Sequence, residues 1–134
     1  MTDSPADHEL ADRYRRYNGL CNAHDFDRLG EFVAPDIRVN DEPTGLAAYT
    51  AGLSDVIAAF PDYHWQIRHL VVNRPLVAAH FTDTGTHRGA PFLGVAATGR
   101  PVRIDEFAVY AWSGGLISEV WVASDRLAAR VQLE

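Results

Sequence analysis

The apolar residues in the first part of the chain recur at helical spacing. Between about residues 8 and 24 they follow one another at intervals of four, three and four, so they share one face of a predicted helix. That face consists of Leu10, Tyr14, Tyr17 and Cys21. Two more helices, over residues 27–33 and 46–60, and one short strand, over residues 37–40, are predicted before Pro61.

From residue 63 onward apolar and polar residues alternate, which is the period of a β-strand. Two turn sequences, Asn73-Arg74-Pro75 and Ser113-Gly114-Gly115, predict hairpins. Residues 88–99 contain three Gly and one Pro and are predicted to form a loop or flap. The predicted strands cover residues 63–73, 76–86, 102–112 and 116–124, and a final helix covers residues 125–133.

Helices that precede an antiparallel meander predict an α+β fold, in which the helices pack on one face of the sheet. The predicted strands are apolar on both faces in places, since Ala108 and Tyr110 share one face while Phe107 and Val109 share the other. Such a sheet needs cover on both sides. We therefore expect a second copy of the chain on the outer sheet face, in a homodimer or homotetramer.

Length and charge narrow the class of protein. The chain has 134 residues, which is typical of a single domain (1–134), and we expect residues 1–7 to be flexible. It carries 18 acidic and 12 basic residues, a net charge of −6, so neither nucleic acid nor an anionic membrane is expected as a partner. A single Cys excludes an internal disulfide, and no signal peptide or membrane-spanning run is visible, which favours a cytoplasmic protein.

Eight short strings follow one another along the chain. The strings are Tyr17-Asn18, Asn22-Ala23-His24-Asp25-Phe26-Asp27, Phe32-Val33-Ala34-Pro35-Asp36, Phe60-Pro61-Asp62, Gly85-Thr86-His87-Arg88-Gly89, Phe92-Leu93-Gly94, Thr98-Gly99-Arg100-Pro101 and Ile117-Ser118-Glu119-Val120-Trp121, followed by Asp125. Each string is common by itself, but the ordered set covers nearly the whole chain and resembles the SnoaL-like polyketide cyclase family.

The resemblance implies a curved antiparallel (mixed) β-sheet wrapped by three N-terminal helices into a cone with an apolar pocket. The wider fold group includes nuclear transport factors, steroid isomerases, scytalone dehydratase and limonene epoxide hydrolase. Family enzymes close rings on aromatic polyketides by intramolecular aldol chemistry without a metal or a cofactor. A small, apolar, polycyclic substrate and no cofactor are therefore expected, and the six His show no metal-binding spacing.

Asp125 follows a predicted apolar strand and is the first catalytic candidate. A carboxyl group buried at such a place would exchange a proton near neutral pH, which aldol chemistry requires. Judged from the residues alone, an N-cap of the final helix is the commoner use of an Asp there. The resemblance matches Asp125 to the acid/base aspartate of the family, so we predict that Asp125 is catalytic.

Asp41 and Asp105 are further catalytic candidates. By resemblance, Asp41 matches the general-base aspartate of steroid isomerases, although its place before Pro43 also fits a turn. Asp105 and Glu106 are adjacent in a strand, so one of them should face inward. Arg103 shares a face with Asp105, which fits either a surface salt bridge or, by resemblance to limonene epoxide hydrolase, a group that activates water.

Several polar and aromatic residues are candidates for holding a substrate. Tyr17 matches the steroid-isomerase tyrosine that binds an oxyanion, while ordinary core packing is equally open. Asn40 could hydrogen-bond a substrate carbonyl, and His80 could donate a hydrogen bond as a neutral side chain. Aromatic side chains suited to the walls of a pocket include Trp65, Phe107 and Trp121.

The sequence therefore predicts an enzyme of secondary metabolism that performs an intramolecular aldol ring closure. Other functions stay open on the same fold: an anthracycline-type hydroxylation component, an epoxide hydrolase, an isomerase, or a non-catalytic binding or assembly module. Two carboxylates that converge with an arginine around a water would favour epoxide opening. A pocket without a buried carboxylate would favour a binding module.

Overall fold

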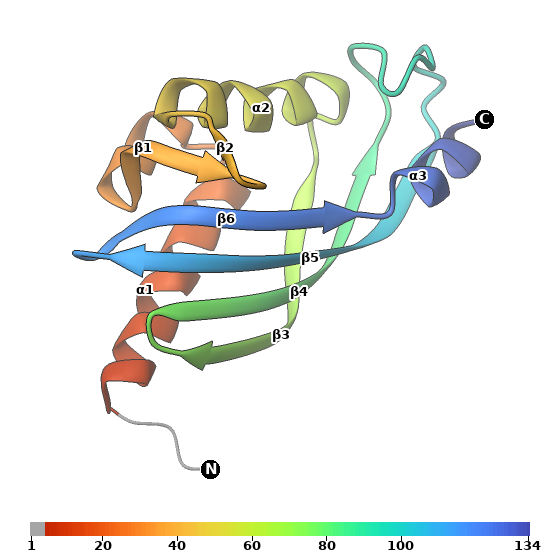
Figure 1. Ribbon diagram of the computed structural model, residues 1–134. Coiled ribbons are helices and arrows are strands. Elements are labelled where there is room, and N and C mark those ends of the chain that lie inside the picture. Colours follow the sequence, from red (N-terminus) through yellow and green to blue (C-terminus); the bar gives the residue numbers. More distant parts are fainter. Residues whose placement is uncertain (1–4) are drawn as a thin grey trace.

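The computed structural model describes residues 5–134, which form an α+β fold as predicted (Figure 1). Residues 5–7 open the first helix, and residues 1–4 of the segment expected to be flexible lie outside the described part. The helices are α1 (Pro5–Asn22), the 3-10 helix η1 (Phe26–Glu31), α2 (Leu46–Ala59) and α3 (Arg126–Leu133), and the strands are β1 (Val33–Val39), β2 (Glu42–Pro43), β3 (His64–Asn73), β4 (Leu76–Thr86), β5 (Pro101–Ser113) and β6 (Leu116–Ser124).

The strands form one open, mixed six-stranded sheet in the order β2-β1-β6-β5-β4-β3. Strand β1 runs parallel to β6, and the other neighbouring pairs are antiparallel. The predicted meander is therefore confirmed over β3 to β6. Strand β1 begins earlier than predicted, because Val33 already pairs with Ile117 of β6.

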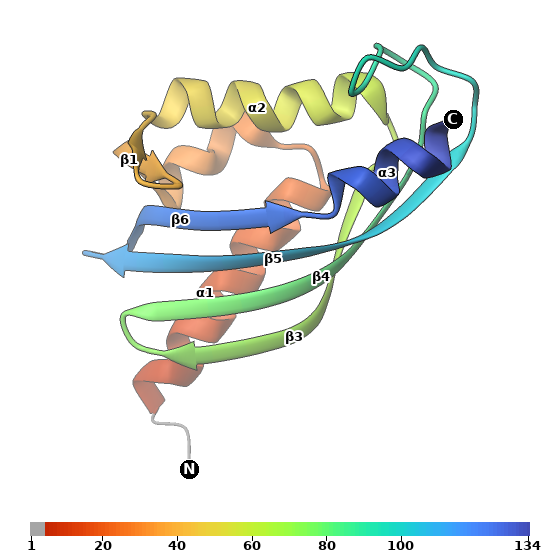
Figure 2. The same cartoon turned by 45° about the vertical axis from the view of Figure 1, so that its right-hand side comes forward.

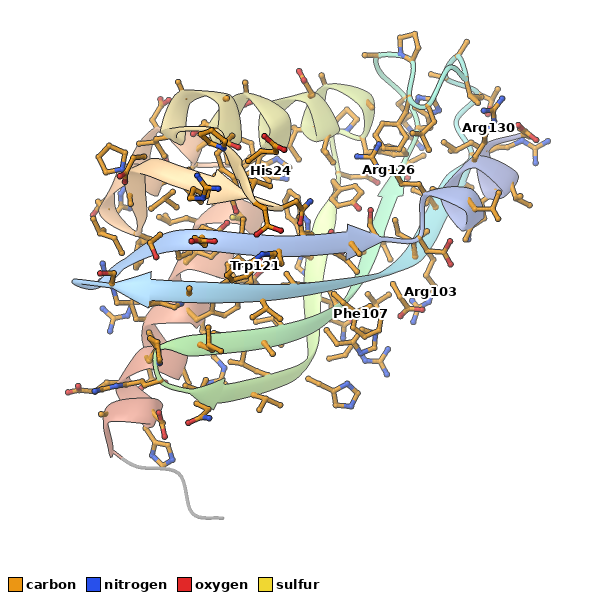
Figure 3. The ribbon with its side chains drawn as sticks, in the orientation of Figure 1. His24, Arg103, Phe107, Trp121, Arg126 and Arg130 are labelled. Carbon is orange, nitrogen blue, oxygen red and sulfur yellow. The ribbon has the colours of Figure 1, made fainter. Side chains whose placement is uncertain are left out.

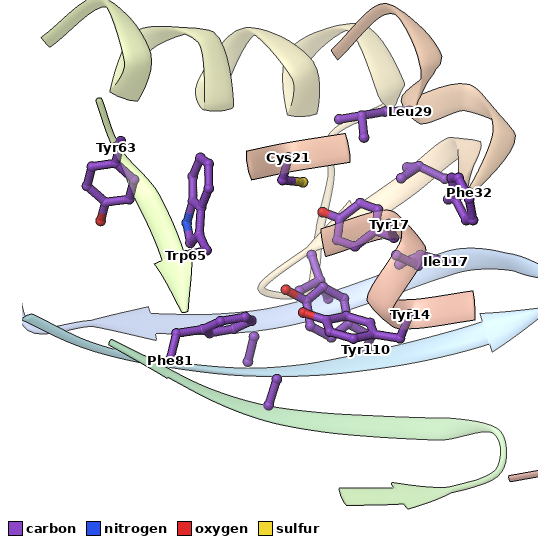
Figure 4. Close-up of a cluster of buried hydrophobic side chains, with 14 of the residues drawn as sticks. Tyr14, Tyr17, Cys21, Leu29, Phe32, Tyr63, Trp65, Phe81, Tyr110 and Ile117 are labelled. Carbon is purple, nitrogen blue, oxygen red and sulfur yellow. The ribbon is translucent and has the colours of Figure 1, made fainter. Parts of the chain in front are cut away.

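Two helices cover one face of the sheet, which we call the inner face. In Figures 1 and 2, α1 passes behind β3, β4 and β5, while α2 runs beside β1 and β6. The predicted helical face is confirmed, since Tyr14, Tyr17 and Cys21 are buried. Figure 4 shows Tyr14 packed against Tyr110 of β5, and their ring centroids lie 4.9 Å apart. Because burying one large apolar side chain contributes roughly 1.5–3 kcal/mol, this face fixes α1 on the sheet.

The alternation along β4 and β5 decides which side chains reach the interior. Odd-numbered residues of β4 are buried, and even-numbered residues of β5 face the same side. The register places Phe81 opposite Glu106, and Asp83 opposite Ile104. Glu106 therefore points toward the inner face, and Asp105 points toward the outer face.

Residues 88–100 form the predicted flap between β4 and β5, and the flap docks on the C-terminal end of α2 (Figure 2). The backbone amide of Gly89 donates a hydrogen bond of 3.1 Å to the carbonyl oxygen of Ala59. The amide of Ala90 donates one of 2.8 Å to the carbonyl oxygen of Ala58. Two main-chain contacts thus hold the flap against the helix.

The variant Gly89→Ala should loosen the docked flap. A Cβ atom at Gly89 would lie 1.8 Å from the carbonyl oxygen of Ala58, so the flap must move away from α2. We expect a loss of about 1–3 kcal/mol of unfolding free energy in urea and faster amide exchange across the flap.

Gly19→Ala is the matched control, because Gly19 is an exposed residue of α1 with open space around its Cβ position. Alanine there should be neutral or should stabilise the protein by roughly 0.5–1 kcal/mol. Equal behaviour of Gly19→Ala and Gly89→Ala would contradict the docking described above.

Candidate active site

A cavity of about 700 Å³ lies between α2 and the inner face of the sheet. We call it the main cavity. Its walls are mostly apolar, and pockets for small molecules commonly measure about 300–1,000 Å³. The apolar and aromatic side chains that line it include Val56, Phe60, Tyr63, Trp65, Ile104 and Val122.

A smaller cavity of about 100 Å³, the tyrosine cavity, adjoins the main cavity. Both are lined by Tyr49, Trp65 and Glu106, so they meet at these side chains. The hydroxyl groups of Tyr17 and Tyr49 hydrogen-bond each other there. Burial raises the pKa of both phenols, so they remain neutral and able to hydrogen-bond a ligand.

Among the described residues, Glu106 is the only carboxyl side chain that lines either cavity. Burial raises the pKa of this group, and a hydrogen bond and the charge of neighbouring Asp83 raise it further. Burial raises the pKa of Asp83 as well. Two adjacent carboxyl groups in such surroundings do not both ionise readily, so the pair retains a proton at neutral pH.

Asp83 is fully buried and lines neither cavity. Its Oδ2 accepts a hydrogen bond of 2.8 Å from the Tyr63 hydroxyl, whereas its Oδ1 finds no other donor among the described residues. Asp83 and Glu106 also interact through a side-chain hydrogen bond, which raises the pKa of Glu106, while the hydrogen bonds from Glu106 and Tyr63 oppose the effect of burial on the Asp83 pKa. The arrangement favours a proton on Glu106, the member that faces the cavity.

Asp125 is exposed and caps α3. Its Oδ1 accepts a hydrogen bond of 3.0 Å from the amide of Ala128, which is the usual contact of an N-cap. The expected burial of Asp125 is therefore wrong, because capping holds its carboxylate at the surface. Its neighbours Ser124 and Arg126 line the main cavity, and a catalytic role of Asp125 stays a prediction.

Asp105, His80, Arg103 and Phe107 lie on the outer face, and Figure 3 labels Arg103 and Phe107. The predicted place of His80 and Phe107 in the pocket is therefore wrong, and so is the pocket alternative for Asp105 and Arg103. The alternation of β4 and β5 sends these four side chains to the outer face. Asp105 Oδ1 lies 2.8 Å from His80 Nε2, and the His80 ring stacks on Phe107 with centroids 4.4 Å apart. Asp105 thus pairs with His80 rather than with Arg103 within the described residues.

Asp41, Trp121 and Asn40 lie where β1 meets β6. The Trp121 indole donates a hydrogen bond of 3.0 Å to Asp41 Oδ1, and both residues lie outside the main cavity because Trp121 has the outward position on β6. Their predicted place in the pocket is therefore wrong. Asn40 accepts a hydrogen bond of 2.9 Å from the Val122 amide, and it lines the edge of the main cavity.

Tyr17 lines the tyrosine cavity, and Trp65 lines both cavities; their role in substrate binding stays a prediction. The sequence reasoning missed the pair formed by Glu106 and Asp83. A signal was present, since the strand period requires one residue of the Asp105-Glu106 pair to face inward. The pattern does not say which of the two it is, because Ile104 and Ala108 beside Glu106 are apolar and so are Phe107 and Val109 on the other face.

An open mixed sheet, helices on its inner face and an apolar cavity between them define a cone-shaped α+β domain. The model of the SnoaL-like polyketide cyclase family matches residues 11–133, so the chain belongs to this family. Among solved structures, a SnoaL-like polyketide cyclase from Agrobacterium tumefaciens is 30% identical, with a TM-score of 0.83 over 93% of this chain and 98% of that chain.

Two Streptomyces proteins have the same fold. IdmH from Streptomyces antibioticus, proposed to be a polyketide cyclase, is 26% identical, with a TM-score of 0.81 over 92% of this chain and 96% of its own. AclR from Streptomyces galilaeus, proposed to be a hydroxylase, is 22% identical, with a TM-score of 0.84 over 95% of this chain and 96% of its own. At this identity the likeness shows the fold alone. A search of curated proteins found no match. Within residues 5–134, no helix combines the length and apolar character needed to traverse a bilayer.

Proposed function

We propose that this protein closes a ring on a polycyclic aromatic polyketide by an intramolecular aldol reaction, with Glu106 as the acid that meets the substrate. The observation that carries the proposal is a carboxyl group with a raised pKa on the wall of a mostly apolar cavity. Apolar walls suit a flat polycyclic substrate. A carboxyl group that stays neutral at pH 7 suits a reaction in which an oxygen atom gains a proton.

In the proposed reaction, a substrate carbon next to a carbonyl group first loses its proton to water, which forms the enolate. The enolate carbon then attacks a ketone carbonyl carbon and forms the new carbon–carbon bond, while the electron pair of the carbonyl π bond moves to the ketone oxygen. The ketone oxygen develops negative charge, and Glu106 donates its proton to it, which yields a hydroxyl group. The resulting Glu106 carboxylate regains a proton from solvent, because burial and Asp83 both favour its neutral form. Exclusion of water from the apolar cavity strengthens the contact between the acid and the developing charge.

Polar groups elsewhere on the walls would orient the substrate. Tyr17 and Tyr49 present neutral hydroxyl groups in the tyrosine cavity, and Asn40 presents an amide at the edge of the main cavity. Trp65 supplies a flat surface between the two cavities. We propose these four residues as the substrate-binding set.

Incubation with polyketide-derived ketones in buffer without added cofactor tests the proposed reaction. Liquid chromatography with mass spectrometry should detect a cyclised product, either of unchanged mass or lighter by one water, formed faster than in buffer alone. A product that has gained an oxygen atom would overturn ring closure and favour the hydroxylation component.

Epoxide opening has less support. That reaction would use two carboxylates that converge with an arginine around a water molecule. Glu106 and Asp83 do converge, but the third partner of the pair is the Tyr63 hydroxyl, and Asp83 does not line the cavity. A non-catalytic binding module has less support as well, since the cavity does hold a carboxyl group.

We also propose that a second copy of the chain covers the outer sheet face. A hollow of about 440 Å³ lies there, and its apolar lining includes Val71, Val109, Phe107 and Trp121. Val71 is 63% exposed and Phe107 is 56% exposed. Clustered apolar side chains of this kind usually contact another protein surface.

The variant Phe107→Asp should therefore dissociate the protein. The wild type should sediment as a dimer or tetramer at micromolar concentration, whereas Phe107→Asp should sediment as a monomer, because the charge would be desolvated at the contact. Leu127→Asp is the control, since Leu127 is an exposed apolar residue of α3 that does not line the hollow. A monomeric wild type would rule out this assembly.

A further inference from the structure

Arg126 is the one basic side chain among the described residues that lines the main cavity. It is the first residue of α3 and is exposed (Figure 3). Within the described residues its guanidinium has no ion-pair or hydrogen-bond partner, unlike Arg130 of the same helix, which lies 2.8 Å from Glu134. The cavity thus has an unpaired positive charge at its rim.

The surroundings of Arg126 leave this charge uncompensated. Glu106, the carboxyl group on the cavity wall, is held neutral by burial and by Asp83, which raise its pKa. Asp125 precedes Arg126 in the chain, but its Oδ1 accepts the capping hydrogen bond from Ala128. A positive charge in the first turn of a helix is also opposed by the helix dipole, so local helix stability does not explain this Arg.

Arg126 and Glu106 line the same cavity, so one substrate can contact both. Glu106 lies opposite Ser124 in the register of β5 and β6, and Arg126 follows Ser124 by two positions. The Asp125 amide still donates a hydrogen bond of 3.1 Å to the carbonyl oxygen of Asp105, so Arg126 begins α3 directly beyond this sheet contact, and both Glu106 and Arg126 line the main cavity. A polycyclic molecule held at one end by Arg126 can therefore present a carbonyl group to Glu106.

From these observations we infer that Arg126 binds a carboxylate of the substrate at the cavity rim, so that the substrate class is an aromatic polyketide acid. A guanidinium offers parallel N–H donors that match the two oxygens of a carboxylate. The remaining cavity wall is mostly apolar and would receive the ring system. The inference rests on the proposed function, which supplies the aromatic rings of the substrate. It adds a carboxylate on the substrate and the orientation of that carboxylate toward Arg126.

The test compares two ligands of nearly equal shape, anthraquinone carboxylate and anthraquinone carboxamide substituted at the same ring position, of which only the carboxylate is charged and offers two acceptor oxygens. Isothermal titration calorimetry with the full-length protein at physiological salt measures both affinities. We expect the wild type to bind the carboxylate about tenfold more tightly than the carboxamide. Arg126→Gln should lose this preference and keep its affinity for the carboxamide.

Arg130→Gln is the matched control, because it removes a positive charge from the same helix at a residue that lines neither cavity. It should keep the wild-type preference. Two results would overturn the inference: equal affinity of the wild type for both ligands, or an equal loss of both affinities in Arg126→Gln. The first result would still support an aromatic ligand in the cavity. Retained turnover in a Glu106 variant would instead overturn the proposed function, so the two failures are distinguishable.

Discussion

Glu106→Gln should lower the turnover number for ring closure roughly 10²–10⁴-fold, the usual contribution of general acid–base catalysis. Glutamine has nearly the size of glutamic acid, and its amide can donate to Asp83 as the protonated carboxyl group does. The variant should therefore fold and bind ligand while lacking a transferable proton. Steady-state kinetics on the cyclised product, together with calorimetry on an aromatic ligand, separate loss of chemistry from loss of binding.

Two further variants make this expectation specific. Glu119→Gln removes a carboxylate from the outer side of β6, opposite Ala111, and should keep full activity. Asp125→Asn preserves a good N-cap and tests the aspartate that the sequence favours. If Asp125→Asn loses turnover and Glu106→Gln retains it, the acid is Asp125, and the assignment of Glu106 is overturned.

The variant Glu106→Gln should also be more stable than the wild type at alkaline pH. Burial and Asp83 raise the pKa of Glu106 in the folded protein, so the folded state holds a proton that the unfolded state releases above about pH 4.3. The stability that depends on this proton is complete below that pH and is lost as the pH rises toward the folded pKa. Each pH unit in this window should cost the wild type up to about 1.4 kcal/mol relative to the variant.

Urea unfolding of both proteins between pH 5 and pH 9 measures this difference. The gap in unfolding free energy should widen steadily with pH in favour of Glu106→Gln. A gap that does not change with pH would mean that Glu106 ionises equally in the folded and unfolded states. Glu106 and Asp83 would then share no proton in the folded protein, and Glu106 could not act as the proposed acid.

The fold was largely predictable because its elements follow from local periodicity. Tyr14, Tyr17 and Cys21 recur at helical spacing, and all three are buried on α1. The two hairpin sequences at residues 73–75 and 113–115 sit at the turns of the meander. Strand β2 was missed, because it has two residues and exists only through pairing with β1, which no local pattern encodes.

The site was harder to predict, because it depends on which face each strand turns inward. The alternation separates Asp105 from Glu106 but does not say which face is the interior. The packing of α1 and α2 on one face makes that face the interior. Glu106 therefore points inward, and Phe107 and Asp105 point outward. The expected burial of Asp125 was wrong for another reason: the amide of Ala128, at the start of α3, lacks a helical partner and hydrogen-bonds the Asp125 carboxylate, which holds that group at the surface.

The attachment of the flap to α2 bears on how such a protein can change its ligand. Both contacts at Gly89 and Ala90 use main-chain atoms, so they place little demand on the identity of the residues that follow. Phe92, further along the flap, reaches the cavity wall. Substitution or insertion beyond the attachment point could therefore reshape the binding space while the scaffold persists, which makes this segment a natural place for directed evolution of new specificity.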